Sequence, residues 1–161
     1  MGQAEVTVTI RAPIERVFDF VDEPSNTPRF MRGITRYDPV GPRRNVKGAV
    51  YASTAVIVGR AFDVELEVTG WKRHEMLKAV SRRGPKTSGT WRFAKAGDDS
   101  TDATLLYEYD LPLVFRFVPG VSAIIEGDLR KSLAKLRTLV EAEARKRPAA
   151  KPRSGARTRP K

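Results

Sequence analysis

The stretch RAPIERVFDFVDEPSNTPRF, residues 11–30, decides the fold because it places two short helices directly after a strand. Pro13 sits where a helix tolerates proline, at a first helical position. The apolar residues behind it recur at three- and four-residue steps, as on one face of a helix: Ile14, Val17, Phe18 and Val21. Asp22 to Pro24 interrupts this pattern, and Pro28 then suits the first turn of a second short helix near Phe30.

Strands are predicted on both sides of these helices. Val6, Val8 and Ile10 alternate with polar residues, which is the two-residue period of a strand with one buried face. Between residues 34 and 111, six further apolar segments are separated by turn-rich breaks such as GPRRNVKG and AGDDSTD. No helix-length segment interrupts these six, so the sequence predicts seven antiparallel strands in one domain and not a parallel arrangement.

The turn at Gly59-Arg60 indicates which residues share a face of the sheet. A two-residue loop there predicts these facing pairs on the apolar side: Ile57 with Phe62, Ala55 with Val64, Ser53 with Leu66, and Tyr51 with Val68. The acids Asp63, Glu65 and Glu67 fall on the opposite, solvent-facing side. Small inward residues such as Ala55 and Ser53 leave space beside their large neighbours, so we expect a gap behind this hairpin.

The C-terminal part of the chain divides into a long helix and a basic tail. Apolar residues recur at helical spacing over residues 121–144, which predicts a helix about 36 Å long. From Arg145 onward there are eight Lys or Arg and no acid, whereas residues 1–144 hold 22 basic and 19 acidic side chains. We therefore expect one globular domain over residues 1–144 and a disordered basic tail over residues 145–161.

This order of elements resembles the START-like, or SRPBCC, superfamily, and specifically its polyketide cyclase/dehydrase-type members. The segments that carry the resemblance are VTIRAPIERVFDFVDEP (8–24), KGAVY (47–51), SGTWRF (88–93) and LRKSLAKLRTLVE (129–141), with Phe30 where many members have tryptophan. The resemblance covers residues 4 to 144. It implies an α+β helix-grip fold, in which a curved, seven-stranded antiparallel sheet surrounds the long C-terminal helix and two short helices follow strand one. It also implies a cavity between sheet and helix, with the short helices near its mouth.

Strand alternation and the resemblance together indicate which residues line that cavity. Trp91 and Phe93 share the inward side of one strand, and Tyr107 and Tyr109 share that of the next. Phe30 is expected either at the mouth or in the core. The predicted ligand-binding residues are Phe30, Tyr51, Ser53, Ala55, Leu66, Trp91, Phe93, Tyr107 and Tyr109. A buried tyrosine hydroxyl needs a partner, so each tyrosine either orients an oxygen of the ligand or packs against the long helix with its hydroxyl at the rim.

The sequence contains few of the groups that catalysis uses. It has no cysteine, and its one histidine, His74, lies in KRHE, which predicts a solvated turn. No metal-binding triad, phosphate-binding glycine loop or serine nucleophile motif occurs. We therefore expect no metal and no cofactor.

These observations favour a binding or transport protein for a small hydrophobic ligand, such as a lipid, a quinone-like compound or an aromatic polyketide. One alternative, implied by the resemblance, is an aromatase- or cyclase-like enzyme that acts on a polyketide. Another is a module that associates with RNA, the ribosome or an anionic membrane through its basic tail, although the same tail also suits a solubilising extension. No segment approaches the roughly 20 apolar residues of a spanning helix, and the N-terminus lacks the pattern of a secretory signal, so we expect a cytoplasmic protein.

Overall fold

The computed structural model describes residues 2–146 of the chain. The strands are β1 (Gly2–Ile10), β2 (Ile34–Val40), β3 (Val50–Ile57), β4 (Arg60–Lys72), β5 (Met76–Arg83), β6 (Lys86–Gly97) and β7 (Ser100–Asp110). The helices are α1 (Ile14–Asp22), α2 (Thr27–Phe30) and α3 (Val121–Lys146), with short 3-10 helices η1 (Pro24–Asn26) and η2 (Leu113–Phe115).

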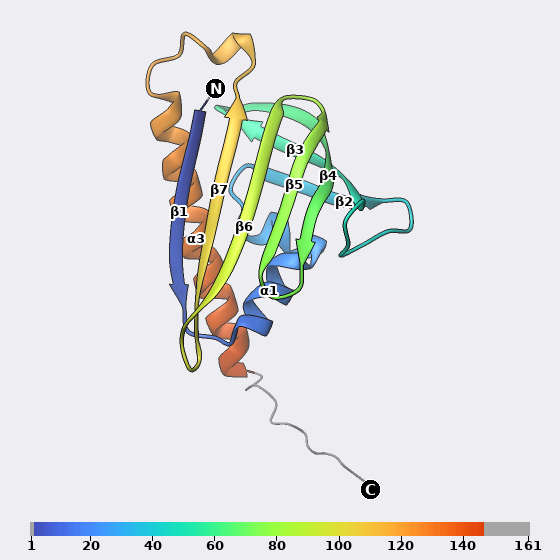
Figure 1. Ribbon diagram of the computed structural model, residues 1–161. Coiled ribbons are helices and arrows are strands. Elements are labelled where there is room, and N and C mark those ends of the chain that lie inside the picture. The colour runs from blue at the N-terminus through green and yellow to red at the C-terminus, as the bar shows by residue number, and fades with distance from the viewer. Residues whose placement is uncertain (1, 147–161) are drawn as a thin grey trace, which may run out of the picture.

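One curved antiparallel sheet holds all seven strands, in the order β1-β7-β6-β5-β4-β3-β2. The long helix α3 lies along the β1 edge of this sheet and also contacts α1 and α2 (Figure 1). The α+β fold predicted from the sequence, with two short helices after strand one, is confirmed. Because α3 lies at one edge of the sheet, the long helix does not cover the inner faces of the strands toward the other edge, where the short α2 contacts β2.

The helical segment after β1 forms as its proline and apolar spacing predict. Pro13 caps α1 in an extended conformation, and Val17 and Phe18 are fully buried beneath the helix. Phe20 is buried as well, which the three- and four-residue spacing did not indicate. The chain then turns through η1, where the Glu23 carboxylate accepts a hydrogen bond from the backbone N–H of Ser25 at 3.1 Å, satisfying a donor at the start of that turn.

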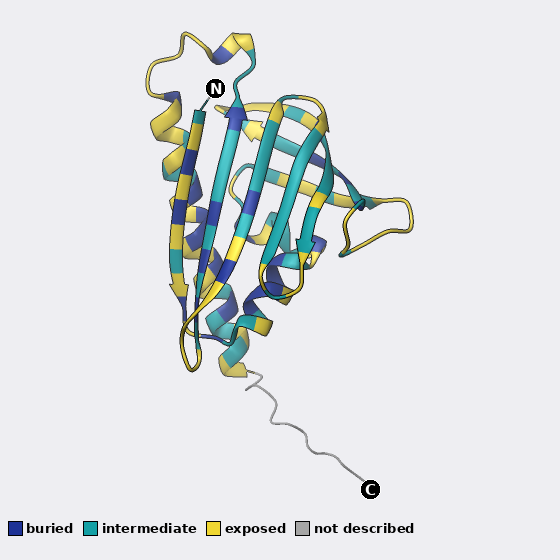
Figure 2. Cartoon of the chain, viewed as in Figure 1, coloured by how far each residue is buried: buried dark blue, intermediate teal, exposed yellow. Residues whose placement is uncertain are grey.

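Two clusters of buried apolar side chains form the core. Figure 2 colours the chain by burial and shows buried positions along β1, β7 and α3. The larger one packs α1 against the sheet and against the C-terminal half of α3, through residues such as Phe18, Phe93 and Leu136. The smaller one packs Leu129 and Leu133 of α3 against β1 and β7. Within residues 2–146, the fully buried members of both clusters come from β1, β6, β7, the helices and the β1–α1 connection, and not from β2 to β5.

The register predicted for the hairpin between β3 and β4 is wrong by two residues. The turn residues are Val58 and Gly59, and Ala55 faces Phe62 instead of Val64. Val58 and Gly59 have φ values of 46° and 79°, and a type I′ turn needs positive φ at both of its central positions. Ser53 accordingly faces Val64, and Tyr51 faces Leu66. A shift of two residues keeps each side chain on its face, so the predicted inward set is unchanged.

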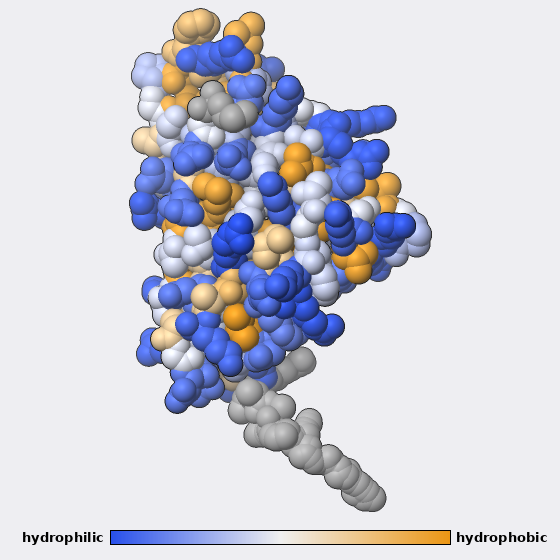
Figure 3. All heavy atoms as spheres, in the orientation of Figure 1, coloured by the Kyte–Doolittle hydropathy of each residue, from blue (hydrophilic) through white to orange (hydrophobic). Residues whose placement is uncertain are grey.

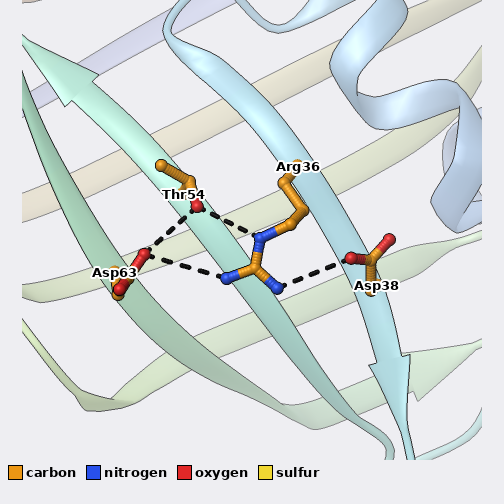
Figure 4. A network of polar contacts seen from close by, with 4 residues as sticks. All are labelled: Arg36, Asp38, Thr54 and Asp63. Carbon is orange, nitrogen blue, oxygen red and sulfur yellow. Dashed lines mark hydrogen bonds and ion pairs between the residues drawn. The ribbon is translucent and has the colours of Figure 1, made fainter.

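The outer face of β2, β3 and β4 carries a network of polar contacts (Figure 4). Arg36 donates to Thr54 Oγ1 at 3.2 Å and forms ion pairs with Asp38 at 3.5 Å and with Asp63 at 3.8 Å. These exposed pairs each contribute about 0–1 kcal/mol to folding stability. The remaining acids predicted for this face, Glu65 and Glu67, both pair with Arg82.

The connection between β7 and α3 exposes several large apolar side chains. Leu113 is 69% exposed and Phe117 is 87% exposed, whereas Phe115 between them is buried against Phe62, with ring centroids 5.7 Å apart. Apolar atoms gather at this end of the molecule in the surface view (Figure 3).

The helix α3 begins after Gly120, whose φ of 76° lets the chain turn sharply into it. Ser132 fixes the helix to the short α2–β2 connection, because its buried hydroxyl accepts a hydrogen bond from the Arg32 N–H at 2.9 Å. The helix continues through Arg145 and Lys146, and the rest of the predicted tail, residues 147–161, lies outside the described residues. None of the helices within residues 2–146 is long and apolar enough to cross a membrane.

Candidate functional site

A cavity of about 160 Å³ lies behind the strands that α3 leaves uncovered. Its walls come from the inner faces of β2 to β7, with Phe30 and Met31 of the α2 segment on the opposite side. Most of the lining is aliphatic or aromatic. The cavity exists because the fully buried core sits on the β1 side of the sheet, while β3 contributes the small inward residues Ser53 and Ala55.

Seven of the nine residues predicted to bind a ligand line this cavity: Phe30, Tyr51, Ser53, Ala55, Leu66, Trp91 and Tyr107. Phe30 fits both of its expected places, because it is buried in the core beside Phe20 and also faces the cavity next to Trp91. Binding by these residues stays a prediction.

Two of the predicted residues lie elsewhere. Phe93 points inward but packs edge-on against Phe18, with ring centroids 5.4 Å apart, and therefore belongs to the core. Tyr109 lines a second cavity of about 100 Å³, which lies between the hairpin end of β3 and the first half of α3. Strand alternation placed both side chains on the correct face of the sheet. It did not show at which positions along each strand the inner face is covered by helices and at which it faces a cavity.

The two cavities share a wall on which the same residues face both: Met31, Ile34, Ala55, Ile57, Pro85, Thr87 and Tyr107. The second cavity also reaches Leu111 and Pro112, where the exposed connection to α3 begins. The shared wall makes the two cavities neighbouring parts of one apolar interior.

One end of the larger cavity is polar. Asp22, at the end of α1, accepts a hydrogen bond from Trp71 Nε1 at 3.1 Å through Oδ1, and its backbone carbonyl accepts one from Asn45 Nδ2 at 2.8 Å. The backbone N–H of Asn45 donates to the Tyr51 hydroxyl at 3.3 Å. Asn45 can do this because asparagine tolerates the left-handed conformation, with φ at 58°, that turns it toward both partners. The Tyr51 ring stacks on Tyr37, with centroids 4.8 Å apart.

Burial controls the protonation of this polar end. It raises the pKa of the Asp22 carboxyl above its ordinary value, and the hydrogen bond from Trp71 offsets part of that rise. Burial also raises the pKa of both Tyr37 and Tyr51, so these hydroxyls stay protonated at neutral pH. On the far wall, burial raises the pKa of Tyr107 to about 12. The cavity therefore presents neutral phenol groups that can donate or accept a hydrogen bond.

Ser53 adds a further polar group close to the tyrosines. Its side chain is 1% exposed, it lines the cavity, and its hydroxyl has no hydrogen-bond partner among the described residues. The sheet register places Ser53 directly opposite Tyr37 and two residues from Tyr51 on the same face. Buried hydroxyl groups are normally partnered, so this one is a candidate contact for a bound molecule.

The groups that catalysis or metal binding would use are sparse within residues 2–146. No three His, Asp or Glu side chains in this range come together as a metal site requires. The expectation that His74 is a solvated turn residue is wrong in part, because its ring is half-buried edge-on against Phe18 at 5.4 Å.

The sequence reasoning missed Tyr37 and Asp22 as parts of the site. Tyr37 could have been found, because it alternates with Arg36 and Asp38 in a strand whose polar residues face solvent. Asp22 gave no signal, since a carboxylate at the end of a helix is ordinary in a sequence.

The sequence matches the family model described as polyketide cyclase / dehydrase and lipid transport, over residues 1–141. Among solved structures, a protein of Thermus thermophilus is 20% identical and superposes with a TM-score of 0.72, over 89% of this chain and 99% of that one. A START superfamily protein of Mycobacterium smegmatis is 17% identical, with a TM-score of 0.66 over 89% of this chain and 97% of that one.

A third solved structure is larger than this chain. The di-domain ARO/CYC StfQ from the steffimycin biosynthetic pathway is 20% identical, with a TM-score of 0.67 over 89% of this chain but only 46% of its own. At these identities the three structures show a shared fold. No curated protein sequence gives a significant match.

Proposed function

The chain belongs to the polyketide cyclase / dehydrase and lipid transport family, and on this premise we propose that it binds and carries a small hydrophobic molecule. The observation that supports this function most is the cavity of about 160 Å³, which is apolar along most of its length and polar at one end. Ligand sites commonly combine apolar walls with a few well-placed polar groups.

The size of the cavity narrows the class of ligand. An apolar cavity of roughly 150 Å³ accommodates a molecule of about the size of benzene. The neighbouring cavity of about 100 Å³ extends the space along the same shared wall. A compact ligand with one or two rings, such as a quinone-like or aromatic polyketide fragment, fits this interior better than a lipid with two long chains.

A cyclase-like enzyme is the second candidate function. The observation that favours it is the half-buried Asp22 carboxyl, whose pKa is raised and which lies at the same cavity end as two neutral tyrosines. Carboxyl groups with a raised pKa in a cleft are often proton donors or acceptors in catalysis. If Tyr37→Phe, Tyr51→Phe and Asp22→Asn all left the turnover of an identified substrate unchanged, this candidate would be excluded.

Native mass spectrometry of gently purified protein, followed by organic extraction, tests the carrier function. Ala55 faces both cavities, so the larger side chain of Ala55→Leu should occupy space in both of them. The variant should therefore copurify with less of the small molecule than the wild type does. Ala52→Leu is the matched control, because Ala52 lies on the outer face of the same strand, beside Glu65. The carrier proposal fails if the wild-type protein carries no small molecule and binds no apolar aromatic probe.

A further inference from the structure

The polar end of the larger cavity selects a particular kind of ligand head group. Resting on the carrier function proposed above, we propose that Asp22, Tyr37, Tyr51 and Ser53 together select a ligand with an uncharged hydroxyl group, such as a phenol or an alcohol, over a carboxylate.

The four residues form one contiguous polar surface. Tyr37 and Ser53 are direct partners across β2 and β3, and Tyr51 precedes Ser53 by two residues on the same face. Asp22 approaches from the end of α1, and its charge acts on both tyrosines. A small polar head that enters between these elements therefore lies within reach of a carboxylate and three hydroxyl groups.

Several hydrogen-bonding positions on this surface have no partner in the described residues. The Ser53 hydroxyl has none, although the residue is almost completely buried. The Tyr51 oxygen accepts from the Asn45 N–H, which leaves its own proton available for donation. A carboxylate accepts several hydrogen bonds, and the side chains of Trp71 and Asn45 leave further accepting positions on Asp22. A ligand hydroxyl, which both donates and accepts, can satisfy all of these groups.

The electrostatic surroundings disfavour an anionic head. The carboxylates of Asp19 and Glu23 act on Asp22 in addition to its own charge, so this end of the cavity is negative. Arg44 is the opposing charge at Tyr51, but its side chain is exposed and does not line the cavity. A buried carboxylate ligand beside Asp22 would be a like-charge pair in a desolvated site.

Lys78 does not change this conclusion. It is the one cationic residue among the described residues that line the larger cavity. Its strand neighbours Leu77 and Ala79 line the cavity too, and alternate residues of a strand face opposite sides. A Cβ atom added at Gly70 would meet both the Lys78 Cβ and the Met76 side chain, so Lys78 and Met76 lie on the same face of the sheet, opposite to Leu77 and Ala79. The ammonium group therefore points away from the cavity.

Three two-ring probes of similar shape test the proposal: naphthalene, 2-naphthol and 2-naphthoate. Their affinities for the ligand-stripped full chain are measured at pH 7 by calorimetry or by displacement of a fluorescent probe. We expect 2-naphthol to bind about tenfold more tightly than naphthalene, and 2-naphthoate to bind more weakly than naphthalene. Equal or tighter binding of 2-naphthoate than of 2-naphthol would overturn the head-group selection while leaving the carrier function intact.

Single substitutions distinguish the contribution of the Asp22 charge to probe binding from that of the Ser53 hydroxyl. Asp22→Asn keeps an oxygen that can accept from Trp71 but removes the charge, so 2-naphthol should lose about tenfold in affinity and 2-naphthoate should gain. Glu15→Gln is the matched control, because it removes an exposed carboxylate at the other end of the same helix and should preserve the order of the three probes. Ser53→Ala should weaken 2-naphthol alone. If Asp22→Asn and Ser53→Ala both leave the order of the probes unchanged, the selection is overturned, and if none of the probes binds, the carrier function itself fails.

Discussion

Ser53 and Thr101 are both buried hydroxyl residues, but they differ in their partners. Thr101 Oγ1 donates to the carbonyl of Ala12 at 2.8 Å and so ties the entry to α1 against β7. The Ser53 hydroxyl has no partner among the described residues. Among the described residues, one hydroxyl is therefore paired and the other is not.

This difference predicts that removing the two hydroxyls has unequal effects on stability. Thr101→Val should lower the free energy of unfolding by about 1–2 kcal/mol, because it leaves the Ala12 carbonyl buried without its donor. Ser53→Ala should change it by less than about 0.5 kcal/mol, or raise it, in ligand-free protein, because no hydrogen bond is lost. Urea denaturation of both variants beside the wild type measures the two values. A large loss for Ser53→Ala would mean that the hydroxyl has a partner in the folded protein.

Asp22 predicts a pH dependence of stability. Because the folded protein raises the pKa of this carboxyl, the folded state binds more protons than the unfolded state between the ordinary value of about 3.9 and the raised one. The contribution of Asp22 to stability therefore falls as the pH rises through this window, and the ionised carboxylate destabilises the fold above it. Asp22→Asn should accordingly raise the free energy of unfolding at pH 7, and the gain should vanish as the pH falls below about 3.9.

Denaturation curves of both proteins from pH 3 to pH 8 would measure this difference, with Glu15→Gln, which removes an exposed carboxylate of the same helix, as the control that gains less. A gain for Asp22→Asn that did not depend on pH would contradict this explanation.

At the scale of the elements, the sequence predicted the seven strands and three α-helices of residues 2–146 but not the two 3-10 helices or every contact between the elements. The hairpin shows why. Glycine was expected to open the turn, yet Val58 precedes it in the turn with φ at 46°, a conformation that a β-branched residue rarely adopts. The preference of glycine for the first turn position therefore predicted the wrong turn residues. The register is set instead by the pairing of β3 with β4 along their full length.

The strained turn predicts a stabilising substitution. Val58→Asn should raise the free energy of unfolding by about 1 kcal/mol, because Asn-Gly is the preferred sequence of a type I′ turn. Val56→Asn serves as the control, since Val56 is similarly exposed but lies in an extended strand, where asparagine is unfavourable. Thermal denaturation compares the two variants, and a loss of stability for Val58→Asn would mean that the turn tolerates valine without strain.

The connection between β7 and α3 contains two phenylalanines that differ in burial, Phe115 and Phe117, and their substitutions can be compared. Phe115→Ala should lower the free energy of unfolding by about 3 kcal/mol, because it removes the ring that packs against Phe62. Phe117→Ala should change it by less than about 0.5 kcal/mol, because that ring is 87% exposed. Equal losses in chemical denaturation would show that Phe117 is covered in solution.

For the molecule as a whole, the sequence predicted the architecture and most of the cavity wall, because alternation and helical spacing are local patterns. It could not predict the lateral position of α3 on the sheet, which depends on how the two core clusters pack around residues such as Leu129 and Leu136. Because of the position of α3, Phe93 is buried in the core, whereas Trp91, two residues earlier on the same face, lines the cavity. The position of α3 also decides that Tyr109 lines the smaller cavity.

The basic end of the chain gives a prediction for the whole molecule. Residues 147–161 hold six Lys or Arg and no acid. Deleting them should abolish any salt-sensitive binding to RNA or to anionic vesicles, because that attraction is electrostatic. The thermal midpoint should stay unchanged, since α3 ends at Lys146. Sedimentation with vesicles or RNA at two salt concentrations measures the effect, and binding that survives the deletion would exclude this segment as its cause.

The space behind β3 also bears on how the protein responds to compression. Hydrostatic pressure favours unfolding in proportion to the internal voids that unfolding eliminates. Without a bound molecule in the interior spaces of about 160 Å³ and 100 Å³, the folded chain should have a larger molar volume than close packing would give it and should unfold at a lower pressure than the ligand-bound protein. A bound molecule would occupy this space and so raise the pressure at which the protein unfolds. The unfolding pressure would therefore show whether a ligand is bound, without any label on the ligand.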